Sequence, residues 1–398
     1  MSTRRQFLQQ SALVSLAPLV PAFLARSAMA ARAQPDERVL IVIQLDGGND
    51  GLNTVIPYAD PLYARYRKEL RIKTDQVIKV NEAVGLHPQL RPAAELLDDG
   101  RLAIVQGVGY PNPNRSHFES MAIWHHARLE TSDHDSIGWL GRAADALKQH
   151  RPATGGSTYI GADAVPVALR GRRSSCISLQ DESDLKLTAA VGTTNSMAGG
   201  TSDVATFVQR SIADSFDAAE RFQQSANVAK SKDNYPQSKL GEKLRLVSKL
   251  LKLGGSTRIY YVSQSGYDTH AAQLFTHSQL LDEFAEALKA LLDDLKSAQL
   301  DDRVVVLAFS EFGRRVEENG SAGTDHGAAG PVFLAGAPVR AGVIGEHPSL
   351  ANLDQGDLKM TIDFRRVYAG LLRPWLGADA ALVLGQSFSP LACVKTGY

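Results

Sequence analysis

Side chains that can bind a metal ion gather in four short stretches of this 398-residue chain. Each stretch adjoins a short apolar run, and the residues concerned are Asp46, Asp268, His270, Glu311 and His326. Carboxylate oxygens combined with imidazole nitrogens suit a divalent cation such as Zn²⁺, Mn²⁺, Mg²⁺ or Ca²⁺. If parallel strands bring these stretches to one edge of a sheet, we expect the five residues to converge there on a metal whose identity the sequence leaves open.

Each of these residues also has an ordinary structural explanation. Asp46 precedes two glycines and could cap a turn. His270 could open the helix that follows it, and Glu311 could pair with a neighbouring arginine at the surface. The metal hypothesis therefore depends on the four stretches meeting in space.

A candidate nucleophile, Ser116, begins a predicted helix. Ser116 and Glu119 have the S-x-x-E spacing of a capping box, in which the serine only caps the helix. A helix start also favours anions, and a nearby metal would lower the pKa of the Ser116 hydroxyl and make it a nucleophile. Arg115 would then hold a phosphate or sulfate oxygen, with His117 beside it. The sequence does not decide between the cap and the nucleophile.

The elements that position these residues alternate between strands and helices. Runs of β-branched residues predict strands at Arg38–Leu45, Leu102–Val108, Thr257–Val262, Arg303–Phe309 and Pro331–Leu334. Apolar residues at three- and four-residue spacing predict helices at Leu90–Leu97, Ser116–Arg128, Leu244–Leu253, His270–Leu295 and Ile362–Leu376. This alternation is typical of an α/β fold, with a mostly parallel sheet sandwiched between helices.

One stretch departs from this pattern. Residues 151–238 are rich in Gly, Ser, Thr, Gln and Ala and poor in large apolar side chains. We interpret them as inserted loops and helices that decorate the sheet. Residues 31–398 would then form a single domain with a variable insertion around residues 151–238.

The first thirty residues have the features of an export signal. Arg4 and Arg5 precede a nearly uncharged stretch, and Ala28–Ala30 (AMA) resembles a cleavage site. The paired arginines specify the twin-arginine (Tat) pathway, so we expect the Tat translocase as a partner during export. The mature protein would be periplasmic or secreted, and no later segment is long and apolar enough for a stable membrane span.

The overall composition argues against a nucleic-acid partner. Lys and Arg number 43 and Asp and Glu also number 43, so the formal net charge is zero. Cys176 and Cys393 are too far apart for a metal-binding motif and are either buried thiols or one disulfide. The pattern does not favour other histidines as ligands, and we expect a loop or surface position for His87, His150, His277 and His347.

The motifs together resemble the exported bacterial family called domain of unknown function 1501. They are the twin-arginine leader, Leu45–Asn53 (LDGGNDGLN), Asn114–Phe118 (NRSHF), Gly138–Gly141 (GWLG), Phe309–Arg314 (FSEFGR) and Thr324–Gly327 (TDHG). The resemblance covers nearly the whole mature chain, but the family name supplies no reaction. That family in turn resembles the alkaline phosphatase and sulfatase superfamily, an α/β sandwich with two metals and a serine, threonine or formylglycine nucleophile at the carboxyl edge of its sheet.

By this resemblance, Asp46, Asp268, His270, Glu311 and His326 match metal ligands and Ser116 matches the nucleophile. The chain also departs from the superfamily pattern. Asp268 and His270 are separated by one residue where alkaline phosphatases have three, and Phe312 stands where the superfamily has a histidine. By this resemblance one of the two metal sites is short of a ligand, which leaves a single metal or none as alternatives to two. Ser116 lies outside a Cys-x-Pro-x-Arg motif, which argues against a formylglycine enzyme.

The resemblance and the residues together predict an exported, metal-dependent hydrolase of phosphate or sulfate esters. The substrate would be a small-molecule or polymer ester. The metal would activate Ser116, and Arg115 or Arg314 would stabilise charge on the transferring group. The alternative is a non-catalytic exported protein that uses the same fold for binding or assembly, because fold does not settle function.

Overall fold

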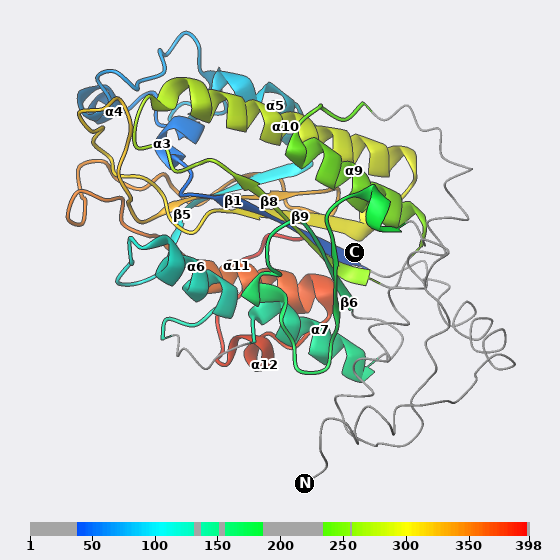
Figure 1. Ribbon diagram of the computed structural model, residues 1–398. Helices are drawn as coiled ribbons and strands as arrows, with labels where there is room; N and C mark the ends of the chain where they lie inside the picture. The colour runs from blue at the N-terminus through cyan, green and yellow to red at the C-terminus, as the bar shows by residue number, and fades with distance from the viewer. Residues whose placement is uncertain (1–37, 131–136, 151–155, 186–233, 255–256, 396–398) are drawn as a thin grey trace, which may run out of the picture.

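The computed structural model describes residues 38–130, 137–150, 156–185, 234–254 and 257–395. Within these ranges a nine-stranded sheet runs through the centre of the protein, in the order β11-β5-β10-β9-β1-β8-β6-β7, with β12 also paired to β5 (Figure 1). Its strands are β1 (Val39–Asp46), β5 (Leu102–Gly109), β6 (Gly156–Ile160), β7 (Cys176–Leu179), β8 (Thr257–Ser265), β9 (Val304–Phe309), β10 (Gly330–Ala335), β11 (Gly342–Ile344) and β12 (Ile362–Asp363).

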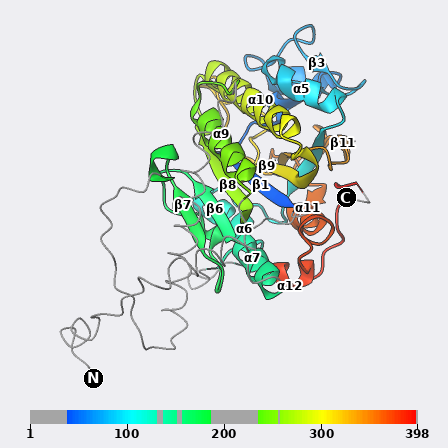
Figure 2. The same cartoon turned by 90° about the vertical axis from the view of Figure 1, so that its right-hand side faces the viewer.

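Helices cover both faces of the sheet (Figures 1 and 2). On one face lie α5 (Arg91–Asp98), α9 (Lys239–Lys252) and α10 (Gln273–Ser297). On the other lie α6 (His117–His126), α7 (Trp139–His150), α11 (Phe364–Leu371) and α12 (Ala380–Leu384). Successive β1 side chains alternate between the two cores: Ile41 and Ile43 pack on one side, and Leu40 and Val42 on the other. The predicted α/β fold with a sheet between helices is confirmed.

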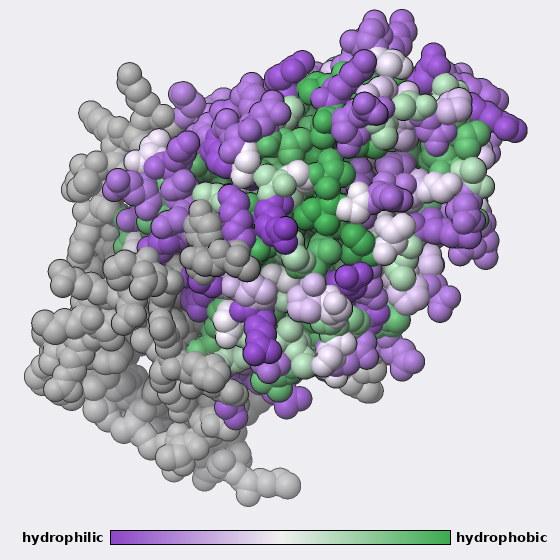
Figure 3. Space-filling model, turned by 180° about the vertical axis from the view of Figure 1, so that it is seen from behind, coloured by the Kyte–Doolittle hydropathy of each residue, from purple (hydrophilic) through white to green (hydrophobic). Residues whose placement is uncertain are grey.

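Smaller elements flank the sheet. The second sheet joins β2 (Val55–Ile56), β4 (Gly85–Leu86) and β3 (Ile78–Lys79), and the short helices beside it are α3 (Gly51–Thr54) and α4 (Pro61–Tyr66). The 3₁₀ turns are Pro88–Leu90, Val167–Leu169, Glu182–Leu185 and Asp301–Arg303, and a π-helical turn, Leu372–Leu376, extends α11. Viewed from behind, the surface is mostly polar with a band of apolar residues (Figure 3), a mixture that is normal for a folded protein.

The direction of one strand decides which loops meet at the sheet edge. β1 pairs in parallel with β8 and β9, whereas β10 is antiparallel to both β5 and β9. The start of β10 therefore lies at the edge where β5, β9, β1 and β8 end. A wholly parallel sheet would place the residues before β10 at the opposite edge, so this reversal brings His326 to the other candidate ligands.

The stretch predicted to be an insertion contributes to the sheet itself. β6 pairs in parallel with β8, and β7 extends the sheet beyond β6. Their sequences, GSTYI and CISL, contain small and polar residues that conceal their strand character. Residues 186–233 of that stretch, and the predicted signal at residues 1–30, lie outside the described residues.

Two further expectations concern cysteines and membrane spans. Cys176 and Cys393 are both free thiols rather than a disulfide, and burial raises the pKa of Cys393 to about 12. No helix among the described residues is long and apolar enough to cross a membrane.

Candidate metal centre

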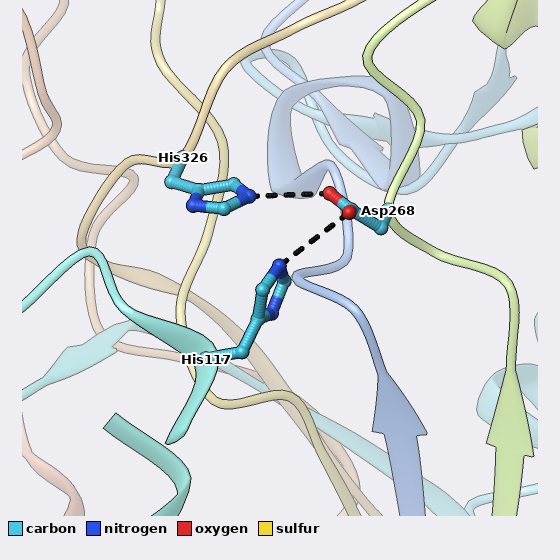
Figure 4. A group of neighbouring side chains, drawn as sticks. All are labelled: His117, Asp268 and His326. Atoms are coloured by element: carbon cyan, nitrogen blue, oxygen red, sulfur yellow. Dashed lines mark hydrogen bonds and ion pairs between the residues drawn. The ribbon is translucent and has the colours of Figure 1, made fainter. Parts of the chain in front are cut away.

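Four side chains meet at the carboxyl edge of the sheet. Asp268 and His270 follow β8, His326 precedes β10, and His117 is the first residue of α6, which follows β5. His270 Nε2 lies 3.1 Å and His326 Nε2 3.2 Å from Asp268 Oδ1, and His117 Nε2 lies 3.5 Å from Asp268 Oδ2. Figure 4 shows His117 and His326 pointing at Asp268 from two sides. We call these four residues the His/Asp cluster.

The backbone around β1 lets these loops approach closely. Asp46 pairs with Ser265 at the ends of β1 and β8, so the two following loops start side by side. Gly47 has a φ of +117°, and a Cβ there would lie 2.5 Å from the backbone nitrogen of Asp268. Only glycine satisfies both conditions without strain. The first glycine of the Gly47-Gly48 pair therefore fixes where Asp268 sits.

The hydrogen bond of His326 to the backbone sets its tautomer. His326 Nδ1 lies 2.7 Å from the carbonyl oxygen of Arg115, which only accepts hydrogen bonds, so Nδ1 carries the proton. In the neutral ring, Nε2 then presents a lone pair. That atom faces a carboxylate oxygen of Asp268 at 3.2 Å and His270 Nε2 at 3.0 Å.

His117 has the same arrangement with a carboxylate behind it. Its Nδ1 lies 2.8 Å from Glu311 Oε1, so Nδ1 donates and Nε2 is left with a lone pair in the neutral ring. Among the described residues, this buried Nε2 has no hydrogen-bond partner. The hydrogen bond to Glu311 outweighs burial and raises the pKa of His117.

His270 completes the pattern. Its Nδ1 lies 3.1 Å from Asp325 Oδ1, and Asn319 holds both that oxygen and the backbone carbonyl of His270 through its side-chain amide. Each of the three imidazoles is thus held at Nδ1 by an oxygen acceptor and turns Nε2 toward Asp268. Metal-bound histidines are held in this way, because the outer acceptor fixes the tautomer and the orientation of the ring.

The His/Asp cluster suits a cation better than it suits the bare protein. Lone-pair nitrogens and carboxylate oxygens converge on one another beside solvent, since Asp268 and His270 are exposed, and a cation or a proton between them would relieve the repulsion between these acceptors. Ligand atoms of His117, Asp268 and His326 all lie within 4.8 Å of one another. Imidazole nitrogens and carboxylate oxygens are common ligands of Zn²⁺, and a zinc ion held by three such protein ligands keeps a fourth position open for water or substrate.

Asp268 is held in its charged form by a buried arginine. Burial favours the neutral acid, but the hydrogen bond and the positive charge of Arg314 outweigh it and lower the pKa of Asp268 to about 2. Arg314 also donates to the backbone carbonyls of Gly48, Tyr267 and Thr324. We expected Arg314 to stabilise a transferring group, but its guanidinium is buried and fully occupied by these acceptors.

Glu311 and Asp46 lie behind the cluster instead of in it. The Glu311 carboxylate is buried and accepts hydrogen bonds from the backbone amide of Gly47 and from His117. Asp46 accepts a hydrogen bond from the Gln44 side chain, and its pKa is raised by burial and by the charge of Glu311. Of the five predicted ligands, three therefore face each other directly, while these two surround His117 from the protein side.

The residues before α6 also differ from expectation. The Arg115 guanidinium donates through Nε and Nη2 to the buried Asp357 carboxylate at 2.9 and 2.6 Å, and the Arg115 backbone carbonyl holds His326. Ser116 takes the N-cap position of α6, but its side chain makes no capping hydrogen bond, and its backbone amide donates to Asn114. The expected capping box is not formed, and Ser116 is exposed.

A family model described as "Protein of unknown function (DUF1501)" matches residues 37–379. The chain belongs to the DUF1501 family. No curated protein matches it.

Several solved structures are similar to this DUF1501 chain at low identity. The lipoteichoic acid synthase LtaP from Listeria monocytogenes is 10% identical, with a TM-score of 0.34 over 85% of this chain and 80% of that one. The PsFucS1 sulfatase from Pseudoalteromonas sp. is 10% identical, with a TM-score of 0.39 over 82% and 67%. A protein of the alkaline phosphatase superfamily from Vibrio parahaemolyticus is 11% identical, with a TM-score of 0.34 over 83% and 72%. All three TM-scores are below 0.5.

Two residues of this DUF1501 site have roles that the sequence did not indicate. Asp325 was not among the predicted ligands or catalytic residues, yet it orients His270. His117 was placed beside a bound anion, yet its Nε2 faces the cluster. The adjacent pair Asp325-His326 was a usable signal, because an acidic residue next to a candidate ligand is well placed to hold a second ligand from another loop.

Proposed function

We propose that this protein is a metal-dependent hydrolase of phosphate or sulfate esters, acting after export through the Tat pathway. One observation carries the proposal: three imidazoles, each held at Nδ1 by an oxygen acceptor, turn their Nε2 atoms toward Asp268. His117, Asp268, His270 and His326 would hold the metal. When bound, a divalent ion there would polarise an ester and lower the pKa of a bound water or hydroxyl.

The start of α6 supplies what an anionic ester needs next to such a site. The first backbone amides of a helix lack partners within the helix and attract anions. Ser116 lies at this position, one residue before His117, with its hydroxyl free of the capping bond that would otherwise occupy it. We assign Ser116 as the nucleophile and the first amides of α6 as the contact for the phosphate or sulfate group. Arg115 and Arg314 act by holding Asp357 and Asp268 in place.

Export is proposed on the features of residues 1–30. Replacing Arg4 and Arg5 by lysine should leave the precursor in the cytoplasm. Normal amounts of mature protein in the periplasm of cells without the Tat translocase would contradict this route.

The experiment that tests the proposed activity measures metal content and turnover on the same sample. We would purify the mature protein, load it separately with Zn²⁺, Mn²⁺, Mg²⁺ and Ca²⁺, and follow hydrolysis of chromogenic phosphate and sulfate esters. Turnover should require a metal and be lost in Ser116→Ala, while the matched variant Ser238→Ala, at the cap of α9, keeps it. Turnover that survives Ser116→Ala would assign the attack to water instead.

Arg115 and Arg314 are each paired with a carboxylate of the protein, which favours a second candidate function. If neither Arg115 nor Arg314 is free to hold an anion, the same metal centre could serve a non-catalytic exported protein that binds a ligand through the metal. Stoichiometric metal binding without hydrolysis of any phosphate or sulfate ester would support this alternative.

A further inference from the structure

A buried glutamine joins the two loops that carry the cluster. Gln273 is the first residue of α10 and is fully buried. Its Oε1 accepts hydrogen bonds from two threonine hydroxyls, Thr269 at 3.0 Å and Thr324 at 2.6 Å. Thr269 lies between Asp268 and His270, and Thr324 lies two residues before His326. One oxygen atom therefore contacts both ligand-bearing loops.

The orientation of the Gln273 amide is set by a charged partner. Its Nε2 donates to Asp50, whose carboxylate is buried and forms a two-point ion pair with Arg67. Burial would raise the pKa of Asp50, but the Arg67 charge outweighs it and lowers that pKa to about 2. Since Asp50 is an anion, it only accepts hydrogen bonds. The amide nitrogen must face it, and the amide oxygen must face the two hydroxyls.

Other hydrogen bonds join the same two loops, some of them beside Gln273 and others farther out, where His270 contacts Asp325 and Asn319. The backbone amide of Thr324 donates to the carbonyl of Thr269 at 3.2 Å, and the amide of Gln273 donates to the carbonyl of Ala322 at 2.8 Å. Arg314 donates to the Thr324 carbonyl and to Asp268. A residue that is small, apolar or acidic at position 273 would lose either the shared acceptor or the donor to Asp50.

We propose that Gln273 is a positioning residue that sets the distance between the loops of Asp268-His270 and His326, and thereby the metal affinity of the His/Asp cluster. This inference rests on the metal site of the proposed function. It does not require that the protein be a hydrolase. The Gln273 side chain bonds to Thr269 and Thr324 and not to the four residues of the His/Asp cluster, so it acts on the cluster through these two threonines.

The test compares Gln273→Met with Gln279→Met. Methionine keeps the length of the side chain and removes its hydrogen bonds, and Gln279 is an exposed glutamine of the same helix. At a matched folded fraction, Gln273→Met should weaken Zn²⁺ binding by about 10- to 100-fold, the range found for residues that orient metal ligands. It should also change the visible absorption spectrum of the Co²⁺-loaded protein, which reports the ligand geometry. Gln279→Met should change neither.

Two additional measurements separate positioning from simple destabilisation. Thr269→Ser and Thr324→Ser keep the hydroxyls and should bind Zn²⁺ like the wild type, whereas Thr269→Val and Thr324→Val should resemble Gln273→Met. Leu291→Ala, a cavity in the buried face of α10, should lower stability and leave the Co²⁺ spectrum unchanged. An unaltered affinity and spectrum in Gln273→Met would overturn the proposal.

Amide hydrogen exchange of the metal-free protein tests the coupling of the two loops separately from metal binding. Gln273→Met should speed exchange in residues 268–270 and 321–326 together, and Gln279→Met should not. A wild-type protein that binds no Zn²⁺ or Co²⁺ would overturn the metal site and the effect of Gln273 on affinity. Unchanged exchange in both loops would overturn the coupling of the loops even if the metal binds.

Discussion

Two groups of histidines in this protein differ in how their ring nitrogens are satisfied. The buried group consists of His87 and His277, whose ring nitrogens form hydrogen bonds with backbone or side-chain groups of the protein. His87 Nδ1 accepts from the backbone amide of Gln89, its Nε2 lies 3.2 Å from the Ser278 hydroxyl, and His277 Nε2 lies 2.9 Å from Asn49 Oδ1. Burial lowers the pKa of His87 to about 3 and that of His277 to about 4, so both are neutral at pH 7.

The histidines of the His/Asp cluster have partners on one side only. Their Nδ1 atoms are held by oxygen acceptors, while their Nε2 atoms turn toward a carboxylate and toward one another. Burial of a histidine, or its closeness to other polar residues, therefore does not identify it as a metal ligand. Donors matched to acceptors indicate a structural histidine, whereas acceptors that converge on acceptors indicate a place for a cation.

The largest effect is expected from Asp268→Asn, because Asp268 is the anion on which the three Nε2 atoms converge. An amide keeps the shape but removes the charge, so the loss of Zn²⁺ affinity should exceed the ~100-fold upper range found for residues that only orient ligands. Isothermal titration against a competing chelator measures it. The control His277→Gln should bind Zn²⁺ normally. Equal loss in both variants would erase the distinction between the two groups.

The next largest effect is the loss of folding stability at low pH that is caused by the buried histidine His277. The pKa of His277 falls from its usual 6.5 to about 4 in the folded protein, so the unfolded chain binds more protons between these values. Stability is therefore highest above pH 6.5 and is lost as the pH falls toward 4. His277→Gln should reduce this loss by up to about 3 kcal/mol, at ~1.4 kcal/mol per pKa unit.

Urea denaturation at pH 7 and at pH 4.5 gives the two free energies of unfolding for each protein. An exposed glutamine serves as control, since Gln279→Met should preserve the wild-type pH dependence. If His277→Gln loses as much stability on acidification as the wild type, His277 is not the buried neutral group that the comparison requires.

A smaller change in metal affinity is expected from Glu311→Gln. Glu311 fixes His117 by accepting from its Nδ1, and the amide accepts more weakly and can turn its nitrogen toward the ring. The affinity for Zn²⁺ should fall by about 10- to 100-fold at a matched folded fraction. A loss as large as that of Asp268→Asn would instead place Glu311 among the direct ligands, as the sequence first indicated.

The fold could be predicted where the local sequence was decisive. Continuous β-branched runs marked β1, β5, β8, β9 and β10, whereas β6 and β7 gain their strand structure from pairing with β8 and are too short and polar to reveal it. The burial of His277, which we expected at the surface, could have been found. It lies on the helical face that includes Leu281, Phe284 and Leu288.

The residues around the metal site could be predicted as a group, but the sequence did not distinguish direct ligands from residues that hold the ligands in place. Asp268 and His270 follow β8, so residue type and strand order were enough to suggest their edge, whereas His326 reaches that edge only because β10 is antiparallel to its neighbours. His117, and not Glu311, faces Asp268, while Glu311 holds His117 from behind. This arrangement depends on the tertiary packing of α6, which the spacing of residues in the sequence does not predict.

The smallest effect concerns the stability contributed by Ser116, and it sharpens the same distinction between satisfied and unsatisfied polar groups. Ser116 and Ser238 both occupy N-cap positions, but only Ser238 accepts a capping hydrogen bond, from the backbone amide of Gly241. Ser238→Ala should lower the free energy of unfolding by ~1 kcal/mol. Ser116→Ala should change it by less than about 0.5 kcal/mol, because a surface hydroxyl without partners contributes little. Urea denaturation of the two variants measures both values. A loss of ~1 kcal/mol in Ser116→Ala would show that its hydroxyl caps α6 after all, and the case for Ser116 as a free nucleophile would then have lost its structural basis.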